Sequence, residues 1–109
     1  MKRARTYSPY TLEAAALLGQ RIRASRIERR WTMEQLAERL GVSAPTVQKI
    51  ERGEPSVGLG IAFEAATLTG VPLFHPDPDR LSVEAARASD RLAVLPRLAR
   101  QPRRIDDDF

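Results

Sequence analysis

The spacing of apolar residues predicts short amphipathic helices separated by glycine and proline. Residues 32–54 read TMEQLAERLGVSAPTVQKIERGE. Apolar side chains recur there three or four residues apart, on two successive helical faces: Leu36, Ala37 and Leu40, then Val47 and Ile50. Gly41 lies between the two faces, and glycine readily takes the left-handed conformation that ends a helix. This stretch therefore predicts two short helices joined at a glycine.

The expected ends of both helices carry capping residues. Thr32 with Gln35 three residues later has the spacing of a capping box. Ser43 is suited to cap the second helix, and Pro45 falls within its first turn, where a missing N–H costs nothing. Gly53 ends it. Two capped helices around a glycine turn are typical of a helix-turn-helix.

Two further helices are predicted to flank this motif. The first begins at Ser8-Pro9 and runs to about Arg30, and the second spans about residues 57–69, capped at Ser56 and ended by Gly70. Their predicted inward faces are Ala15, Leu18 and Ile22 in the first, and Leu59, Ala62, Phe63, Ala66 and Leu68 in the second.

A fifth helix is predicted from Asp77-Pro78 to Leu95, where Pro96 would end it. Its apolar residues are spaced alternately four and three apart, as in a heptad seam: Leu81, Ala85, Ala88, Leu92 and Leu95. The seam fits packing on the chain's own core, and it also fits a symmetric dimer contact.

We therefore expect an all-α protein, with a five-helix architecture and a short C-terminal extension. Residues 1–7 are predicted as a flexible basic arm and 8–74 as the domain, with the motif at 33–52. Residues 75–96 hold the linker and the helix with the heptad seam, for which dimerisation is one of the two roles considered, and 97–109 form a flexible tail of mixed charge.

Charge is unevenly distributed along the 109 residues. The whole chain has a net charge of +4, whereas residues 1–30 carry eight basic and two acidic residues, a local net charge of +6. Such asymmetry suits a polyanionic partner, although a basic face can also serve solubility alone. The chain has no cysteine and no apolar run long enough for a membrane span, so we expect a cytoplasmic protein without a membrane partner.

No catalytic constellation is evident. The single histidine, His75, has no cysteine or second histidine with which to bind zinc, and no glycine-rich phosphate loop occurs. The aspartates at 106–108 lie in the predicted tail, which is unsuited to a rigid metal site. We therefore expect neither an enzyme nor a cofactor or metal.

The second motif helix has an outward face suited to DNA. This face contains small, hydroxyl, amide and cationic side chains and no acidic one: Ala44, Thr46, Gln48, Lys49 and Arg52. A helix in the major groove needs small residues for close approach and hydrogen-bonding side chains for base edges. The alternative is a solvated helix in a generic bundle.

Two residues before the motif are predicted to be structural. Arg26 continues the inward stripe of the first helix, so its charge needs a partner, for which Glu51 is the candidate. Trp31 is expected to cover the core rather than to stack on bases.

The motif resembles the signature of the Cro and phage-repressor-like (XRE-type) helix-turn-helix family over about residues 16–74. The matching residues are Arg26, Thr32, Leu36, Ala37, Leu40, Gly41, Val42, Ser43, Val47, Ile50, Glu51, Arg52 and Gly53. The resemblance implies a five-helix, lambda-repressor-like domain and an ion pair between Arg26 and Glu51.

It also implies a set of DNA contacts. Ser43, Thr46 and Arg52 would contact the backbone, and Ala44, Pro45, Gln48 and Lys49 would face bases, with Thr32 at the start of the motif in the same DNA-binding set. Many family members have glutamine where this chain has Met33.

More narrowly, residues 51–74 (ERGEPSVGLGIAFEAATLTGVPLF) and the arginine-rich tail look like HipB-like regulators encoded beside HipA-type kinases. That resemblance implies a homodimeric repressor that binds operator DNA, serves as the antitoxin of a HipA-like kinase toxin and represses its own operon. The alternatives are a protein-interaction module of the same fold and a stand-alone XRE-type regulator.

Overall fold

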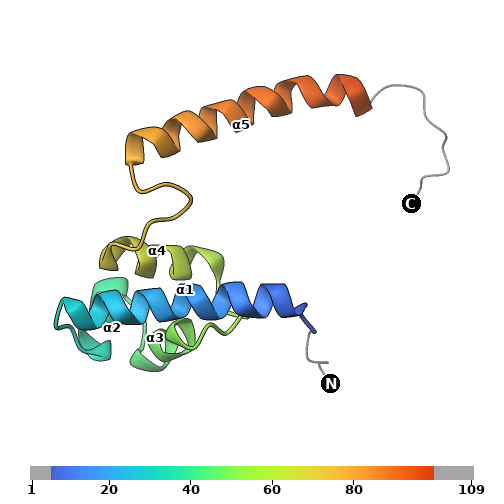
Figure 1. Cartoon of the computed structure of the whole chain (residues 1–109). Coiled ribbons are helices and arrows are strands. Elements are labelled where there is room, and N and C mark those ends of the chain that lie inside the picture. Colours follow the sequence, from blue (N-terminus) through green and yellow to red (C-terminus); the bar gives the residue numbers. More distant parts are fainter. Residues whose placement is uncertain (1–5, 100–109) are drawn as a thin grey trace. The chain divides into compact units, whose positions relative to one another are not determined.

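The computed structural model describes the backbone of residues 6–99 and the side chains of residues 6–95. Its regular elements are five helices (Figure 1): α1 Pro9–Glu28, α2 Met33–Leu40, α3 Ala44–Glu51, α4 Leu59–Thr69 and α5 Pro78–Ala99. The predicted all-α, five-helix architecture is confirmed. Most of the predicted basic arm (residues 1–5) and most of the predicted tail (residues 100–109) lie outside the described residues.

The chain divides into two compact units, Met1–Leu73 with α1 to α4 and Phe74–Phe109 with α5. In the first unit α2 packs on α3, and both helices contact the elements around them: α1 contacts α3 and α4, and α2 contacts α4. The helix-turn-helix α2–α3 is therefore held on one side by α1 and on another by α4, so its orientation depends on both.

The core of the first unit consists of small and medium aliphatic side chains. Its buried members are Ile22, Leu36, Ala37, Val47, Ile50, Ala65, Ala66 and Val71. The predicted inward residues are confirmed by the burial of Leu36 and Ala37 in α2, Val47 and Ile50 in α3, and Ile22 in α1. Leu40, also predicted to face inward, is half-buried and packs against the cluster. Trp31 is half-buried and packs against this cluster, as expected of a residue that covers the core.

Local capping explains where the motif helices begin and end. Thr32 Oγ1 accepts the Gln35 N–H at 3.0 Å, and Gln35 Oε1 accepts the Thr32 N–H at 2.8 Å, so the predicted capping box is present. Gly41 ends α2 in the left-handed conformation, with φ of 74°. Ser43 caps α3 and Pro45 lies in its first turn.

Helix α1 crosses the C-terminal end of α3 at a glycine. A Cβ atom at Gly19 would lie 2.6 Å from the carbonyl oxygens of Ile50 and Glu51. Gly53 has φ of 73°, and a Cβ there would lie 2.6 Å from the carbonyl oxygen of Ala15. The two backbones can approach this closely only because both positions lack a side chain.

The end of α1 differs from the prediction. The helix ends at Glu28, not near Arg30, because Arg30 has the left-handed φ of 61° and cannot continue it. Arg29 forms the C-cap, and its Nε donates to the carbonyl oxygen of Thr69 at 2.9 Å. This bond places a cation on the C-terminal end of α4, where the helix dipole favours it.

The start and the inward face of α4 also differ from the prediction. Residues 54–57 form a turn, with the Val57 N–H bonded to the Glu54 carbonyl, so the helix begins at Leu59 with Gly58 as N-cap and not at Ser56. Leu59 is 68% exposed, and the buried residues of α4 are Ala65, Ala66 and Thr69. The predicted inward position of Leu59 is therefore wrong.

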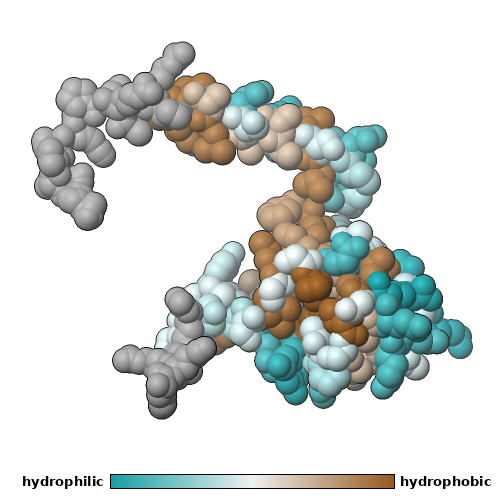
Figure 2. Space-filling model, turned by 180° about the vertical axis from the view of Figure 1, so that it is seen from behind, coloured by the Kyte–Doolittle hydropathy of each residue, from teal (hydrophilic) through white to brown (hydrophobic). Residues whose placement is uncertain are grey.

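In the second unit α5 continues through Pro96 to Ala99, so the predicted end at Pro96 is wrong. Pro96 lacks the backbone donor that would bond to the carbonyl group of Leu92, and α5 ends three residues after it. Every side chain from residue 78 to residue 95 is exposed, and Figure 2 shows apolar atoms on the surface of this helix.

Candidate nucleic-acid interface

Helix α3 has one buried and one exposed face. Val47 and Ile50 anchor the buried face in the core. Of the predicted DNA-contacting side chains of α3, Pro45, Gln48, Lys49 and Arg52 are exposed and Thr46 is half-buried. Ala44 is half-buried and packs against the core cluster, so its predicted place on the outward face is wrong: it lies one turn before Val47, on the same side of the helix. The exposed face therefore offers an amide, an ammonium and a guanidinium group, with the small residues near the N-terminus.

The N-terminus of α3 carries a pair of hydroxyl groups. Ser43 Oγ accepts the Thr46 N–H at 3.4 Å, and the two side-chain oxygens of Ser43 and Thr46 are 3.0 Å apart. One hydroxyl hydrogen is used between them, so the other is left to donate outward. Together with the positive end of the α3 dipole, this pair is suited to a phosphate oxygen.

Thr32 is placed at the start of α2 by the capping box. It is exposed, and its Oγ1 is occupied as an acceptor by the Gln35 N–H. Its hydroxyl hydrogen remains a donor. The role of Thr32 in this structure is thus first to begin α2, and any DNA contact would be made by its hydroxyl group in addition.

A hollow of about 240 Å³ adjoins the base of the α3 face, and it adds a residue that the sequence reasoning missed. Its lining includes Arg23 of α1, Met33 of α2, and Gln48 and Arg52 of α3. Arg23 is therefore close to two members of the predicted set. Helical spacing places Arg23 one turn before Arg26 on α1, but its closeness to α3 depends on how the two helices cross, which no local spacing indicates.

Arg52 is not isolated in the free protein. One of its terminal nitrogens lies 2.6 Å from Glu54 Oε2, in a pair that solvent reaches. An exposed pair of this kind stabilises a protein by only about 0.2–1 kcal/mol. Arg52 can therefore exchange the carboxylate for a phosphate at small cost.

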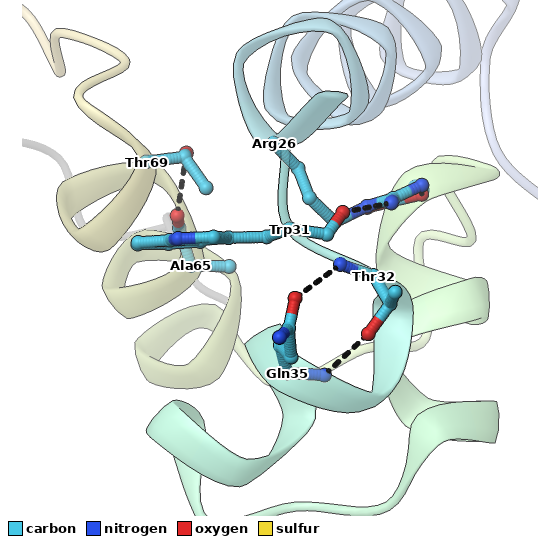
Figure 3. A network of polar contacts seen from close by, with 7 residues as sticks. Arg26, Trp31, Thr32, Gln35, Ala65 and Thr69 are labelled. Carbon is cyan, nitrogen blue, oxygen red and sulfur yellow. Dashed lines mark hydrogen bonds and ion pairs between the residues drawn. The ribbon is translucent and has the colours of Figure 1, made fainter. Parts of the chain in front are cut away.

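The position of α3 is set by a buried ion pair below this face. Arg26 Nε lies 2.6 Å from Glu51 Oε2, and the second hydrogen bond of the fork joins an Arg26 terminal nitrogen to Glu51 Oε1 at 3.1 Å. The remaining Arg26 terminal nitrogen donates to the carbonyl oxygen of Trp31 at 2.8 Å (Figure 3). One guanidinium group thus ties the end of α3 to α1 and to the turn before α2.

Trp31 itself makes cation–π contacts with two arginines. The guanidinium carbon of Arg39 lies 4.2 Å from the centre of the indole, and that of Arg29 lies 5.5 Å from it. Figure 3 shows the indole directed toward α4, at the level of Ala65 and Thr69. These contacts occupy the ring faces, in agreement with a core-covering role and not with base stacking.

The described residues offer neither a metal site nor a membrane span. No group of three or more potential metal-ligating side chains is present there. Of the helices that the structure describes, none combines the length and the hydropathy needed to cross a bilayer.

Comparison with known proteins agrees with this geometry. Residues 22–75 match the family model described as Helix-turn-helix, a segment that begins within α1 and ends after α4. Neither the curated proteins nor the solved structures contain a match to the chain. Residues 22–75 therefore form a helix-turn-helix domain like those of the Cro and phage-repressor-like family, which are DNA-binding regulators of transcription.

Proposed function

We propose that this regulator is a sequence-specific repressor that binds operator DNA as a homodimer, with α3 in the major groove. The observation that carries the proposal is the exposed face of α3, which has no acidic residue. At the N-terminal end of this face lie the hydroxyl groups of Ser43, the N-cap, and Thr46. In a dimer, two such helices would enter successive major grooves about 34 Å apart on a near-palindromic site.

Base recognition is assigned to two long side chains. Ala44 and Pro45 are too small or too apolar to read base edges and instead allow close approach, so Gln48 and Lys49 provide the direct readout. Glutamine pairs best with the N6 and N7 groups of adenine, and lysine with O6 and N7 of guanine. The preferred half-site should therefore contain purines at the two positions that α3 faces.

Backbone contacts are assigned to the residues around this face. Ser43 and Thr46 would bind a phosphate at the start of α3, Thr32 another at the start of α2, and Arg52 a third. The hollow beside Gln48 and Arg52 supports adding Arg23 to this group. Since these contacts neutralise phosphates, binding should weaken steeply as salt is raised.

A Lys49→Ala substitution tests the base-reading role. We expect the ratio of operator to random-sequence affinity to fall about 5- to 150-fold, the equivalent of the 1–3 kcal/mol that a good side-chain-to-base contact provides. The measurement is a gel shift at fixed salt, with the DNA upstream of the chain's own gene as the operator and random duplex as competitor.

Ser43→Asp is the matched control for Lys49→Ala. Aspartate preserves the N-cap of α3 but replaces the hydroxyl donor by a carboxylate that repels phosphate, so operator and random DNA should be bound more weakly by the same factor. An unchanged affinity ratio for Lys49→Ala would contradict the assignment of Lys49 to bases. No preference of the unaltered protein for any duplex would contradict the repressor proposal as a whole.

The finer proposal is that the operon encodes a HipA-like kinase toxin and that this chain is its antitoxin. Its support is the resemblance of residues 51–74 and the arginine-rich tail to HipB-like regulators. Co-expression with the product of the neighbouring gene should yield a complex that represses the shared promoter. Deleting residues 97–109 should weaken that complex and leave operator binding unchanged. If the neighbouring gene does not encode a kinase and its product forms no complex with this chain, the result would indicate a stand-alone regulator.

A further inference from the structure

Helix α5 presents an apolar stripe that none of the described residues of its own unit covers. The five seam residues are all exposed, with Leu81 at 38%, Leu92 at 64% and Leu95 at 37%. Two alanines, Ala85 and Ala88, lie between the leucines in the middle of the helix. The stripe thus has large side chains toward both ends and small ones at its centre, which allows a second helix to approach closely there.

We propose that α5 pairs in antiparallel orientation with α5 of a second copy of this chain, a proposal that rests on the homodimer proposed above. In the register that overlaps residues 78–95 completely, Leu81 contacts Leu92 of the partner subunit. Ala85 contacts Ala88 of the partner subunit in the adjacent layer. The two-fold axis repeats both layers, so each leucine and alanine of this central stretch gains an apolar neighbour.

The charges beside the stripe favour this orientation. Glu84 and Arg91 both precede an inner position of the heptad, and in the antiparallel register Glu84 lies beside Arg91 of the partner subunit, twice by symmetry. In a parallel pair Glu84 would lie beside Ser89 and Arg91 beside Pro96, with no opposite charge in either place. Antiparallel helix dipoles also attract at both ends of the pair.

The other charges of the described helix do not oppose this pairing. Their heptad positions are on the outer side of α5: Asp79, Arg80, Arg87 and Asp90. Glu84 has only a weak partner within its own chain, since Arg87 approaches it at 3.5 Å in an exposed pair. Both Glu84 and Arg91 are therefore available to a second helix at little cost.

Cysteine cross-linking distinguishes the orientations directly, because the chain has no cysteine of its own. Leu81→Cys and Leu92→Cys are purified separately, mixed in equal amounts and oxidised with copper phenanthroline. The mixture should form a disulfide-linked dimer, and neither variant alone should do so. Like residues in the antiparallel pair are eleven positions apart along the helix, about 16 Å, whereas a disulfide needs Cα atoms within about 7 Å.

A second measurement uses two similarly exposed residues on different faces. Leu92 lies in the seam and Val94, which is 55% exposed, lies outside it. Each residue is replaced by aspartate in a separate variant. Sedimentation equilibrium on the full chain should show that Leu92→Asp dissociates the dimer and that Val94→Asp does not, at equal helix content by circular dichroism. Glu84→Arg and Arg91→Glu should each weaken the dimer severalfold, and the double exchange should restore it.

The possible outcomes separate this inference from the proposed function. Cross-linking of either single variant with itself would overturn the antiparallel register. A dimer that none of the α5 substitutions affects would overturn the α5 interface and leave the homodimer in place. Loss of a kinase partner in Leu92→Asp without loss of the dimer would assign the stripe to that partner instead. A chain that is monomeric alone and on its operator would overturn both proposals.

Discussion

Replacing Arg26 by methionine should lower the free energy of unfolding by about 3–5 kcal/mol, the usual cost of removing one member of a buried ion pair. The substitution leaves the carboxylate of Glu51 buried with neither of its two hydrogen bonds from the guanidinium. It also removes the donor to the carbonyl oxygen of Trp31. The midpoint of urea denaturation, with the slope unchanged, measures the loss.

The double-mutant cycle gives this prediction its specificity. Glu51→Leu alone should cost at least as much as Arg26→Met, because a guanidinium group cannot lose its proton in a protein. The variant with both substitutions should be more stable than either single variant, since no unpaired charge remains and the volume is largely preserved. Additive losses in the double variant would show that the two side chains do not act as a pair.

The same cycle has a readout at the DNA-binding face. Glu51 is the last residue of α3, and the fork joins it to α1 and to the turn before α2. We expect the double variant to fold and yet to bind operator more weakly, because the orientation of α3 then depends on apolar packing alone. If the folded double variant binds operator with unchanged affinity, the ion pair contributes to stability alone and not to DNA binding.

Gly19→Ala should destabilise the domain by about 1–3 kcal/mol, although alanine is the better helix former. The added Cβ would lie 2.6 Å from the carbonyl oxygens of both Ile50 and Glu51. These are backbone atoms at the end of α3 and cannot rotate away as a side chain would. Relief of the contact requires α1 and α3 to separate, which also moves the DNA-binding face.

Gly60→Ala is the matched control for Gly19→Ala. Gly60 also lies in a helix, but a Cβ added there meets nothing within 4 Å. This variant should therefore gain up to about 1 kcal/mol from helix propensity. Thermal or urea unfolding of both variants compares them directly. Equal effects of the two substitutions would show that the α1–α3 crossing does not require a glycine.

The helix-turn-helix could be predicted well because its signals are local. A capping box joins residues three apart, as with Thr32 and Gln35, and the left-handed turn at Gly41 depends on one residue. The inward residues of α2 and α3 follow from helical periodicity alone. Arg26 and Glu51 are 25 residues apart, but a charge within an apolar stripe demands a partner, and that demand could be read from the sequence.

The tertiary structure decided what depends on how separate helices meet. The sequence alone does not indicate that Gly19 lies against the carbonyl groups of Ile50 and Glu51, because the crossing point of two helices follows from packing of the whole core. It likewise does not show that Arg23 shares a hollow with Gln48 and Arg52. The start of α4 was mistaken for a related reason: Ser56 has good capping chemistry, but the turn after α3 occupies the backbone through Val57.

By itself, then, the sequence determined that five helices form, the caps of α2 and α3 and the chemistry of the α3 face, since each depends on residues within one or two turns. Only the tertiary structure decided at which glycine α1 and α3 cross, which arginine of α1 lies beside the α3 face and which side of α4 is buried. Those outcomes depend on contacts between segments distant in sequence, and no local spacing encodes them.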